Sequence, residues 1–172
     1  NKFKFFFMNK RSKGQAETIS EYLNKLKKDE SFFVNSCDVF SIFNLKKYLK
    51  LKDSSDIIVF VSSKSFVDLS VNAYSWVEIH NNILKNIYIK KRPKNNLKII
   101  TGNFFFRNKE IYLSCYSKLK HKNKKEFYID DMISEAIKLN YKVKVMEDDI
   151  YLNLGTPELI KDYIFWKKVF KK

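Results

Sequence analysis

Three glycines and one aspartate are the residues whose positions point most directly to chemistry. The chain has only three glycines among 172 residues, so each is expected where a side chain does not fit. Gly14 precedes an apolar helical pattern, Gly102 lies within an apolar strand pattern, and Gly155 lies in a strand-to-helix turn. A glycine inside a strand weakens it unless another backbone or a ligand comes close. An ordinary turn or bulge is the alternative explanation at each of the three positions.

Asp38 closely follows Phe32-Phe33-Val34, an apolar run that predicts a short buried strand over residues 31–36. In α/β sheets, binding sites lie at the ends of strands, so this carboxylate is a candidate site residue. The alternative is an aspartate that caps a turn or a helix. The neighbouring Cys37 has no histidine near it in sequence, and we expect it to be a small buried hydrophobe.

Several other kinds of chemistry find no support in the sequence. His80 and His121 are the only histidines and have no third partner at metal-ligand spacing. The sequence contains neither G-x-S-x-G nor the phosphate-binding G-x-x-x-x-G-K-[ST]. The two cysteines predict no disulfide framework, which indicates a reducing compartment. The apolar stretches are far shorter than the ~18 residues of a membrane span, and the first residues do not predict a signal peptide.

The net charge of +15 would suit nucleic acid or an anionic membrane as a partner. However, almost all of the positive charge is lysine, and arginine occurs only at positions 11, 92 and 107. Proteins that read nucleic acids use arginine for forked contacts with phosphate and guanine. We therefore interpret the lysines as ordinary solvated surface, and expect neither a nucleic-acid nor a membrane partner.

Alternating strand and helix patterns predict one α/β domain over residues 1–172, with a partly antiparallel sheet. The predicted strands cover 3–8, 31–36, 56–62, 74–78, 83–90, 97–107, 142–146 and 150–152. The predicted helices cover 16–27, 43–51, 111–120 and 128–139, followed by a last helix that starts near Thr156, its expected N-cap. The apolar stripe of this last helix is expected to face the core and consists of Leu159, Tyr163, Trp166 and Phe170.

Four segments resemble, in order, motifs of the sugar-phosphate nucleotidyltransferases. They are Gly14-Gln15-Ala16-Glu17-Thr18-Ile19, Phe33-Val34-Asn35-Ser36-Cys37-Asp38, Ile99-Ile100-Thr101-Gly102-Asn103-Phe104-Phe105-Phe106 and Tyr151-Leu152-Asn153-Leu154-Gly155-Thr156-Pro157-Glu158. The resemblance implies a Rossmann-like mixed β-sheet flanked by helices, of the nucleotide-diphospho-sugar transferase type. It also implies a cytoplasmic, Mg²⁺-dependent enzyme of surface polysaccharide biosynthesis. Its partners would be a nucleoside triphosphate and a phosphorylated small-molecule acceptor such as a sugar phosphate, and it would release pyrophosphate.

The resemblance also implies roles for individual residues on the nucleotide side of the site. Gly14 and Gln15 would bind the nucleotide, with the Gln15 amide reading the edge of the base. Asp38 would be catalytic and would hold Mg²⁺ together with Asn153. An amide oxygen binds Mg²⁺ without the charge of a carboxylate, and Asp148 and Asp149 lie near enough in sequence to compensate.

On the acceptor side, the resemblance implies that Arg92, or Lys91 beside it, holds the acceptor phosphate. Thr101 and Gly102 would let the acceptor approach the strand backbone. Lys91 stands where the family's E-K-P motif has glutamate. The family's glycine-rich loop, similar to G-G-x-G-[TS]-R-[LM], has no counterpart before Gly14. The chain therefore resembles the C-terminal two-thirds of such a domain, incomplete at the N-terminus.

Two other functions stay open at this level. The first is a non-enzymatic basic α/β module that binds RNA or another anionic partner. The second is a degenerate relative that keeps the fold without the activity, to which the departures at Lys91 and Asn153 are suited.

Overall fold

The computed structural model describes residues 5–63, 74–90 and 98–171. The helices are α1 (Gln15–Lys25), α2 (Leu45–Lys52), α3 (Lys109–Lys120), α4 (Ile129–Lys138) and α5 (Pro157–Val169). The strands are β1 (Phe32–Asn35), β2 (Val39–Ile42), β3 (Ile57–Ser62), β4 (Trp76–His80), β5 (Ile83–Tyr88), β6 (Lys98–Phe106), β7 (Val143–Glu147) and β8 (Ile150–Asn153). None of the described helices is long and apolar enough to cross a membrane.

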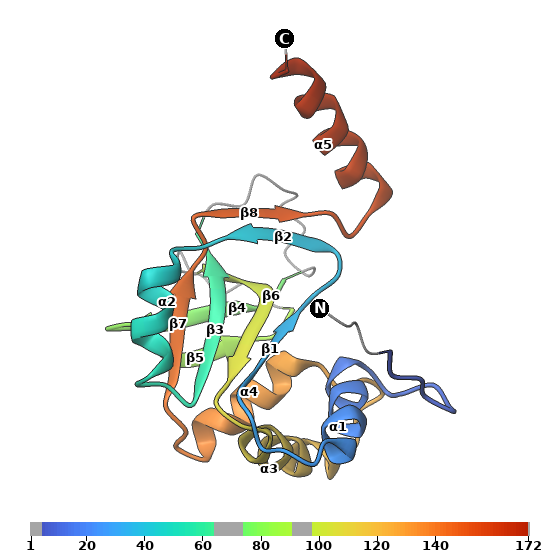
Figure 1. The fold of residues 1–172 in the computed structure, drawn as a ribbon, viewed down its shortest axis with the longest axis vertical. Coiled ribbons are helices and arrows are strands. Elements are labelled where there is room, and N and C mark those ends of the chain that lie inside the picture. Colours follow the sequence, from blue (N-terminus) through green and yellow to red (C-terminus); the bar gives the residue numbers. More distant parts are fainter. Residues whose placement is uncertain (1–4, 64–73, 91–97, 172) are drawn as a thin grey trace.

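Two sheets organise these strands. The larger one has the order β1-β6-β3-β7-β5-β4, and β4 also pairs with β6. The β3–β7 pair is parallel, whereas the other pairs in this sheet are antiparallel. Strands β2 and β8 form a separate antiparallel pair, which lies across one end of the larger sheet (Figure 1). The expected fold class, a mixed sheet flanked by helices, is confirmed.

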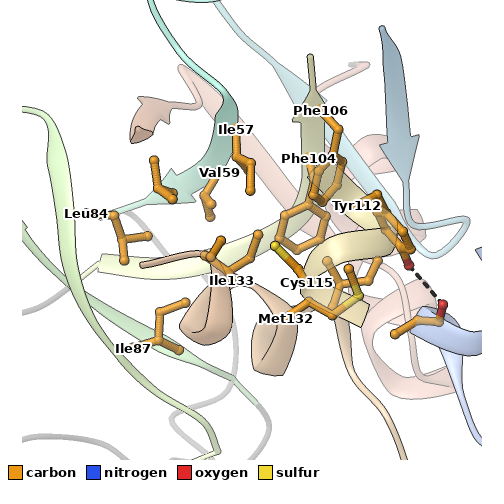
Figure 2. Close-up of a cluster of buried hydrophobic side chains, with 14 of the residues drawn as sticks. Ile57, Val59, Leu84, Ile87, Phe104, Phe106, Tyr112, Cys115, Met132 and Ile133 are labelled. Atoms are coloured by element: carbon orange, nitrogen blue, oxygen red, sulfur yellow. Dashed lines mark hydrogen bonds between the residues drawn. The ribbon is translucent and has the colours of Figure 1, made fainter. Parts of the chain in front are cut away.

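Helices cover both faces of the larger sheet, and this explains why every residue of β3 is buried. Helices α1, α3 and α4 lie on one side, and α2 lies on the other (Figure 1). Figure 2 shows the larger core, where side chains of β3 and β6 meet those of α3 and α4. The Tyr112 hydroxyl of α3 donates a hydrogen bond to the Ala16 carbonyl of α1 at 3.0 Å, which joins these two helices.

The loop between α3 and α4 is anchored to α4 by two ion pairs. Lys122 contacts Glu135 at 2.5 Å, and Lys124 contacts Asp131 at 2.5 Å. Both carboxylates are buried, while both lysines remain partly exposed. A buried carboxylate is costly without a partner, so the lysines hold the loop in one position over α4.

Three elements differ from the local expectations. The described residues 5–8 form no strand. Strand β2 was not expected, because Val39-Phe40-Ser41-Ile42 is short and has only one polar residue to mark an alternating pattern. No residue of α5 is buried, and the helix extends away from the rest of the molecule (Figure 1). Its apolar stripe therefore does not face the core.

Candidate functional site

Asp38 and Asn153 lie side by side, although 114 residues separate them in sequence. Asp38 occupies the turn between β1 and β2, and β2 pairs with β8 so that Val39 lies opposite Asn153. The Leu154 backbone N–H donates to the Asp38 carbonyl at 2.8 Å, which extends the pairing past the end of the strands. The small β2–β8 sheet is thus the element that brings the two side chains together.

Gly155 keeps the space between these two side chains open. A Cβ atom at Gly155 would lie 3.0 Å from Oδ2 of Asp38 and 3.0 Å from Oδ1 of Asn153. Both oxygens therefore border the same small space, which any residue other than glycine would fill. The backbone φ of Gly155 lies outside the left-handed region, so the demand for glycine here comes from the neighbouring oxygens and not from the backbone.

The Asn153 side chain is held at both ends. Its Nδ2 donates to the Tyr74 hydroxyl at 2.8 Å, and its Oδ1 accepts from the Gly155 backbone N–H at 2.8 Å. A carbonyl oxygen has two lone pairs, so Oδ1 keeps one for a further partner. Asp38 is exposed, and its carboxylate is accessible to a ligand.

The two oxygens fit a magnesium ion that is shared with substrate phosphates. Mg²⁺ is usually bound by one or two carboxylates plus phosphate oxygens and water, and rarely by a cage of protein ligands. Within the described ranges, no three histidine, cysteine, aspartate or glutamate side chains come together as a metal-binding group. Asp38 and Asn153 agree with the first arrangement, because Gly155 leaves open the space that their oxygens border.

A pocket of about 860 Å³ is lined on one side by residues 34–37, so its lining reaches the residue before Asp38 but does not include Asp38 itself. The N-terminus of α1, the end of β1 and the loop before α4 form its walls, and Gly14 and Gln15 both line it. Cys37 lines it as well and is exposed, so the expectation of a buried cysteine is wrong. The reason is its place in the β1–β2 turn, where the chain passes over the surface.

Gly14 lies in the wall of this pocket, where two segments of the chain pack closely. Its φ is 129°, and a Cβ there would lie 2.7 Å from the Phe127 carbonyl oxygen. Next to it, the Phe127 N–H donates to the Lys13 carbonyl at 2.7 Å, and the Ala16 N–H donates to the Phe127 carbonyl at 3.1 Å. The start of α1 and the loop before α4 therefore pack backbone to backbone, which only glycine permits at position 14.

Three cationic side chains line the same pocket and were not among the expected site residues. They are Arg11, Lys13 and Lys125. Lys125 follows directly after the loop residues that Asp131 and Glu135 anchor. The only signal in the sequence was the basic stretch from 118 to 125, whose contact with the start of α1 no local pattern reveals. Glu126 lines the pocket too, so three cations face one carboxylate and the net charge of the lining favours an anionic ligand.

Gly102 meets another part of the chain rather than open space. Its φ is 86°, and a Cβ there would lie 2.6 Å from the Ser36 Oγ. The Ser36 N–H donates to the Gly102 carbonyl at 3.1 Å. The absence of a side chain at Gly102 thus lets the segment leading to Asp38 pack closely on β6. Neither Gly102 nor its neighbour Thr101 lines the pocket beside Asp38.

Asp148 is a second carboxyl near this region, and it is buried. Its exposed fraction is 6%, and within the described part of the chain neither of its oxygens makes a hydrogen bond of normal geometry. Burial raises the pKa of Asp148 to about 7; the nearby Thr101 hydroxyl partly opposes this, and the charge of Asp149 adds to it. Of the two carboxylates considered as compensation for Asn153, only Asp149 is exposed to solvent.

Two expected site residues, Lys91 and Arg92, lie outside the described residues. Of the others, the structure brings Asp38 together with Asn153, and it places Gly14 and Gln15 in the adjoining pocket. Thr101 is buried in β6, and Gly102 packs against Ser36.

Comparison with known proteins gives matches in structure. No protein-family model matches the chain, and no curated protein matches its sequence. A nucleoside-diphosphate-sugar pyrophosphorylase from Vibrio cholerae has a TM-score of 0.73 and 21% identity; the match covers 91% of this chain and 66% of that one. The inositol-1-phosphate CTP transferase from T. maritima has a TM-score of 0.66 and 20% identity; the match covers 88% of this chain and 60% of that one. HddC from Yersinia pseudotuberculosis, complexed with GMP-PN, has a TM-score of 0.59 and 17% identity; the match covers 91% of this chain and 64% of that one.

These matches show that the chain has the fold of sugar-phosphate nucleotidyltransferases and related enzymes. The chain spans 66% of the length of the pyrophosphorylase and 60% of that of the CTP transferase.

Proposed function

We propose that the chain is part of a nucleotidyltransferase that joins a nucleoside triphosphate to a sugar phosphate, or a similarly phosphorylated precursor, and releases pyrophosphate. The observation that carries this proposal is the meeting of Asp38 and Asn153 around the open space at Gly155, beside a large pocket lined by cations. The similarity in fold to a pyrophosphorylase and a CTP transferase supports the same reaction class.

The reaction brings two anions together, so charge neutralisation and in-line positioning account for most of its catalysis. Asp38 and Asn153 would hold Mg²⁺, which would supply positive charge to the reacting phosphates. The Tyr74 hydroxyl and the Gly155 N–H fix the direction of the Asn153 amide, so its oxygen needs little reorganisation when a ligand arrives.

The pocket beside Asp38 would take the nucleotide. Gln15 lies at its wall and has an amide that can both donate to and accept from a base edge. Arg11, Lys13 and Lys125 would offset the charge of the phosphates. On the acceptor side, Arg92, or Lys91 beside it, is proposed to hold the acceptor phosphate, as the resemblance implies. The proposal includes a cytoplasmic location and a role in supplying activated precursors for surface polysaccharides.

The test measures pyrophosphate release by the complete product of the gene, with Mg²⁺, each of the common nucleoside triphosphates and a panel of sugar phosphates. Asp38→Ala should abolish turnover, because it removes the carboxylate whose Oδ2 borders the Gly155 space. Asp53→Ala is the matched control, since Asp53 is an exposed aspartate at the end of α2, outside the pocket. Turnover retained by Asp38→Ala would refute the role of this carboxylate.

The charge of +15 favours a second candidate, a module that binds RNA or another anionic partner. Tight binding to a random oligonucleotide that falls steeply with added salt would support this candidate. Binding of a nucleoside triphosphate with Mg²⁺ and no such salt dependence would support the transferase. Mg²⁺-dependent nucleotide binding without pyrophosphate release would instead identify a degenerate relative, in agreement with Asn153.

A further inference from the structure

A buried asparagine interrupts the apolar strand β6 directly after Gly102. Asn103 is 1% exposed, and residues 104–106, which follow it, are buried phenylalanines. Asparagine is depleted in strands, and a buried amide is costly unless hydrogen bonds satisfy it. A polar residue at such a position therefore depends on the partners that the fold brings to it.

The two ends of the Asn103 amide bind two different strands. Its Oδ1 accepts a hydrogen bond from the Nδ2 of Asn35, the last residue of β1, which lies directly opposite Asn103 in the sheet. Its Nδ2 donates to the Ser41 hydroxyl of β2 at 2.7 Å. Because an amide has both an acceptor and a donor, a single side chain of β6 joins β1 to β2.

The two strands that Asn103 joins flank the segment that carries Asp38. Only residues 36–38 separate β1 from β2. At the start of this segment, the Ser36 N–H donates to the Gly102 carbonyl at 3.1 Å. The segment is therefore tied to β6 on both of its sides, and its shortness leaves Asp38 little freedom to move relative to β6.

The same amide also reaches the wall of the pocket. Asn35 lines the pocket, whereas Asn103 does not. With only 1% of its surface exposed, Asn103 is not accessible to a ligand. Any effect of Asn103 on the site must therefore pass through its two partners, Asn35 and Ser41.

We propose that Asn103 is a positioning residue for the metal site: its amide fixes β1 relative to β2 and thereby holds the Asp38 carboxylate beside Asn153 at the Gly155 space. This inference rests on the proposed function, because it gives Asn103 a part in binding the divalent ion. The Asn153 side chain has its own supports, the Tyr74 hydroxyl and the Gly155 N–H. Asp38 is exposed, so the place of its carboxylate depends on the backbone that carries it.

The test measures Mn²⁺ binding by calorimetry, and hydrogen exchange by mass spectrometry, on the complete product of the gene. Asn103→Leu keeps the branched shape of the side chain but can form neither hydrogen bond. It should lower the affinity for Mn²⁺ by about tenfold, the lower end of the effect of groups that orient metal ligands. The backbone amides of residues 36–41 should exchange roughly tenfold faster, because the segment is released from β6, while those of α4 should exchange as in wild type.

Ser41→Ala is the second variant, and it leaves Asn103 itself unchanged. It removes one of the two hydrogen bonds, so it should lower the affinity for Mn²⁺ by a smaller factor. Asn103→Leu removes that bond too, and the double variant should therefore bind Mn²⁺ no more weakly than Asn103→Leu alone.

Ile133→Val is the control for a general loss of stability. Ile133 of α4 is buried in one cluster with Phe104, whose side chain points to the opposite face of β6 from that of its neighbour Asn103. This variant should unfold at a lower urea concentration than wild type and should bind Mn²⁺ with unchanged affinity.

Three results would overturn the proposal. Wild-type Mn²⁺ affinity in Asn103→Leu, even with faster exchange at residues 36–41, would show that Asn103 only stabilises the sheet. A loss of affinity in Ile133→Val equal to that in Asn103→Leu would show a general effect of stability. Effects of Asn103→Leu and Ser41→Ala that multiply in the double variant would show that the two side chains act separately. A wild-type protein that binds no Mn²⁺ would instead refute the metal site itself, and this failure of the proposed function is thus distinct from a failure of Asn103 alone.

Discussion

Replacing Gly102 by alanine tests how closely the segment leading to Asp38 packs on β6. Two separate costs follow from the structure. An L-residue in the left-handed region costs about 1–2 kcal/mol, and Gly102 has a φ of 86°. The new Cβ would also lie 2.6 Å from the Ser36 Oγ and 3.1 Å from the Ser36 Cβ, and such overpacking typically costs about 1–3 kcal/mol. The free energy of unfolding should therefore fall by about 2–5 kcal/mol.

A double-mutant cycle with Ser36→Ala divides this cost into its two parts. Removing the Ser36 hydroxyl takes away the closest contact of the new methyl group but leaves the backbone strain. The double variant should therefore recover about 1 kcal/mol or more of the loss, whereas Ser36→Ala alone should change stability little. Urea unfolding of the four proteins measures all the terms. A Gly102→Ala variant that loses less than about 0.5 kcal/mol, or a cycle with no coupling, would refute the close packing inferred here.

Three further predictions concern the site. Gly155→Ala should leave the free energy of unfolding within about 1 kcal/mol of wild type, because the φ of Gly155 is ordinary. It should lower the rate of pyrophosphate release by about 10- to 100-fold, because the new methyl group pushes Asp38 and Asn153 apart. An unchanged rate would contradict the conclusion that these two side chains border one functional space. Asn153→Asp should raise the affinity for Mn²⁺ by about tenfold in a calorimetric titration, since the charge of the ligands sets the affinity for hard cations. The Tyr74 hydroxyl and the Gly155 N–H can both donate to the new carboxylate, so its position should be kept. An unchanged affinity would exclude residue 153 as a metal ligand. Asp148→Asn should remove a pH dependence of the free energy of unfolding. Burial raises the pKa of Asp148 from 3.8 to about 7. The protonated carboxyl therefore stabilises the fold fully below pH 3.8, and this stabilisation is lost as the pH rises toward 7. Unfolding at pH 5 and pH 8 should show that the variant gains about 2 kcal/mol relative to wild type at the higher pH, and parallel curves would contradict the burial of this carboxyl.

The parts of the fold that could be predicted are those whose cause is local. The β-branched run Ile57–Val61 predicts a strand covered on both faces, and all of β3 is buried. Thr156 and Pro157 predict the start of α5, and the Thr156 hydroxyl accepts from the Leu159 N–H at the first turn. Short-range capping and apolar runs act over a few residues, so the sequence displays them directly.

The parts that escaped prediction depend on partners distant in the chain. The apolar stripe of α5 indicates that the helix has an apolar side, but it does not show that this side lies away from the core of the described chain. Strand β2 exists because β8 pairs with it. The three cations of the pocket come from two segments more than 100 residues apart in sequence. Gly102 was correctly expected to permit a close approach, but the group that approaches is Ser36 of the same chain.

The pairing of β2 with β8 has a consequence for the order in which the protein matures. Asn153 is synthesised 115 residues after Asp38, and Gly155 follows it by two residues. Until β8 has been synthesised, the oxygens of Asp38 and Asn153 cannot come together, whereas all the residues that line the pocket lie before β8 in the chain. A translation product that stops before β8 would thus contain the pocket with its cationic side chains but not the pair of oxygens that meet at Gly155.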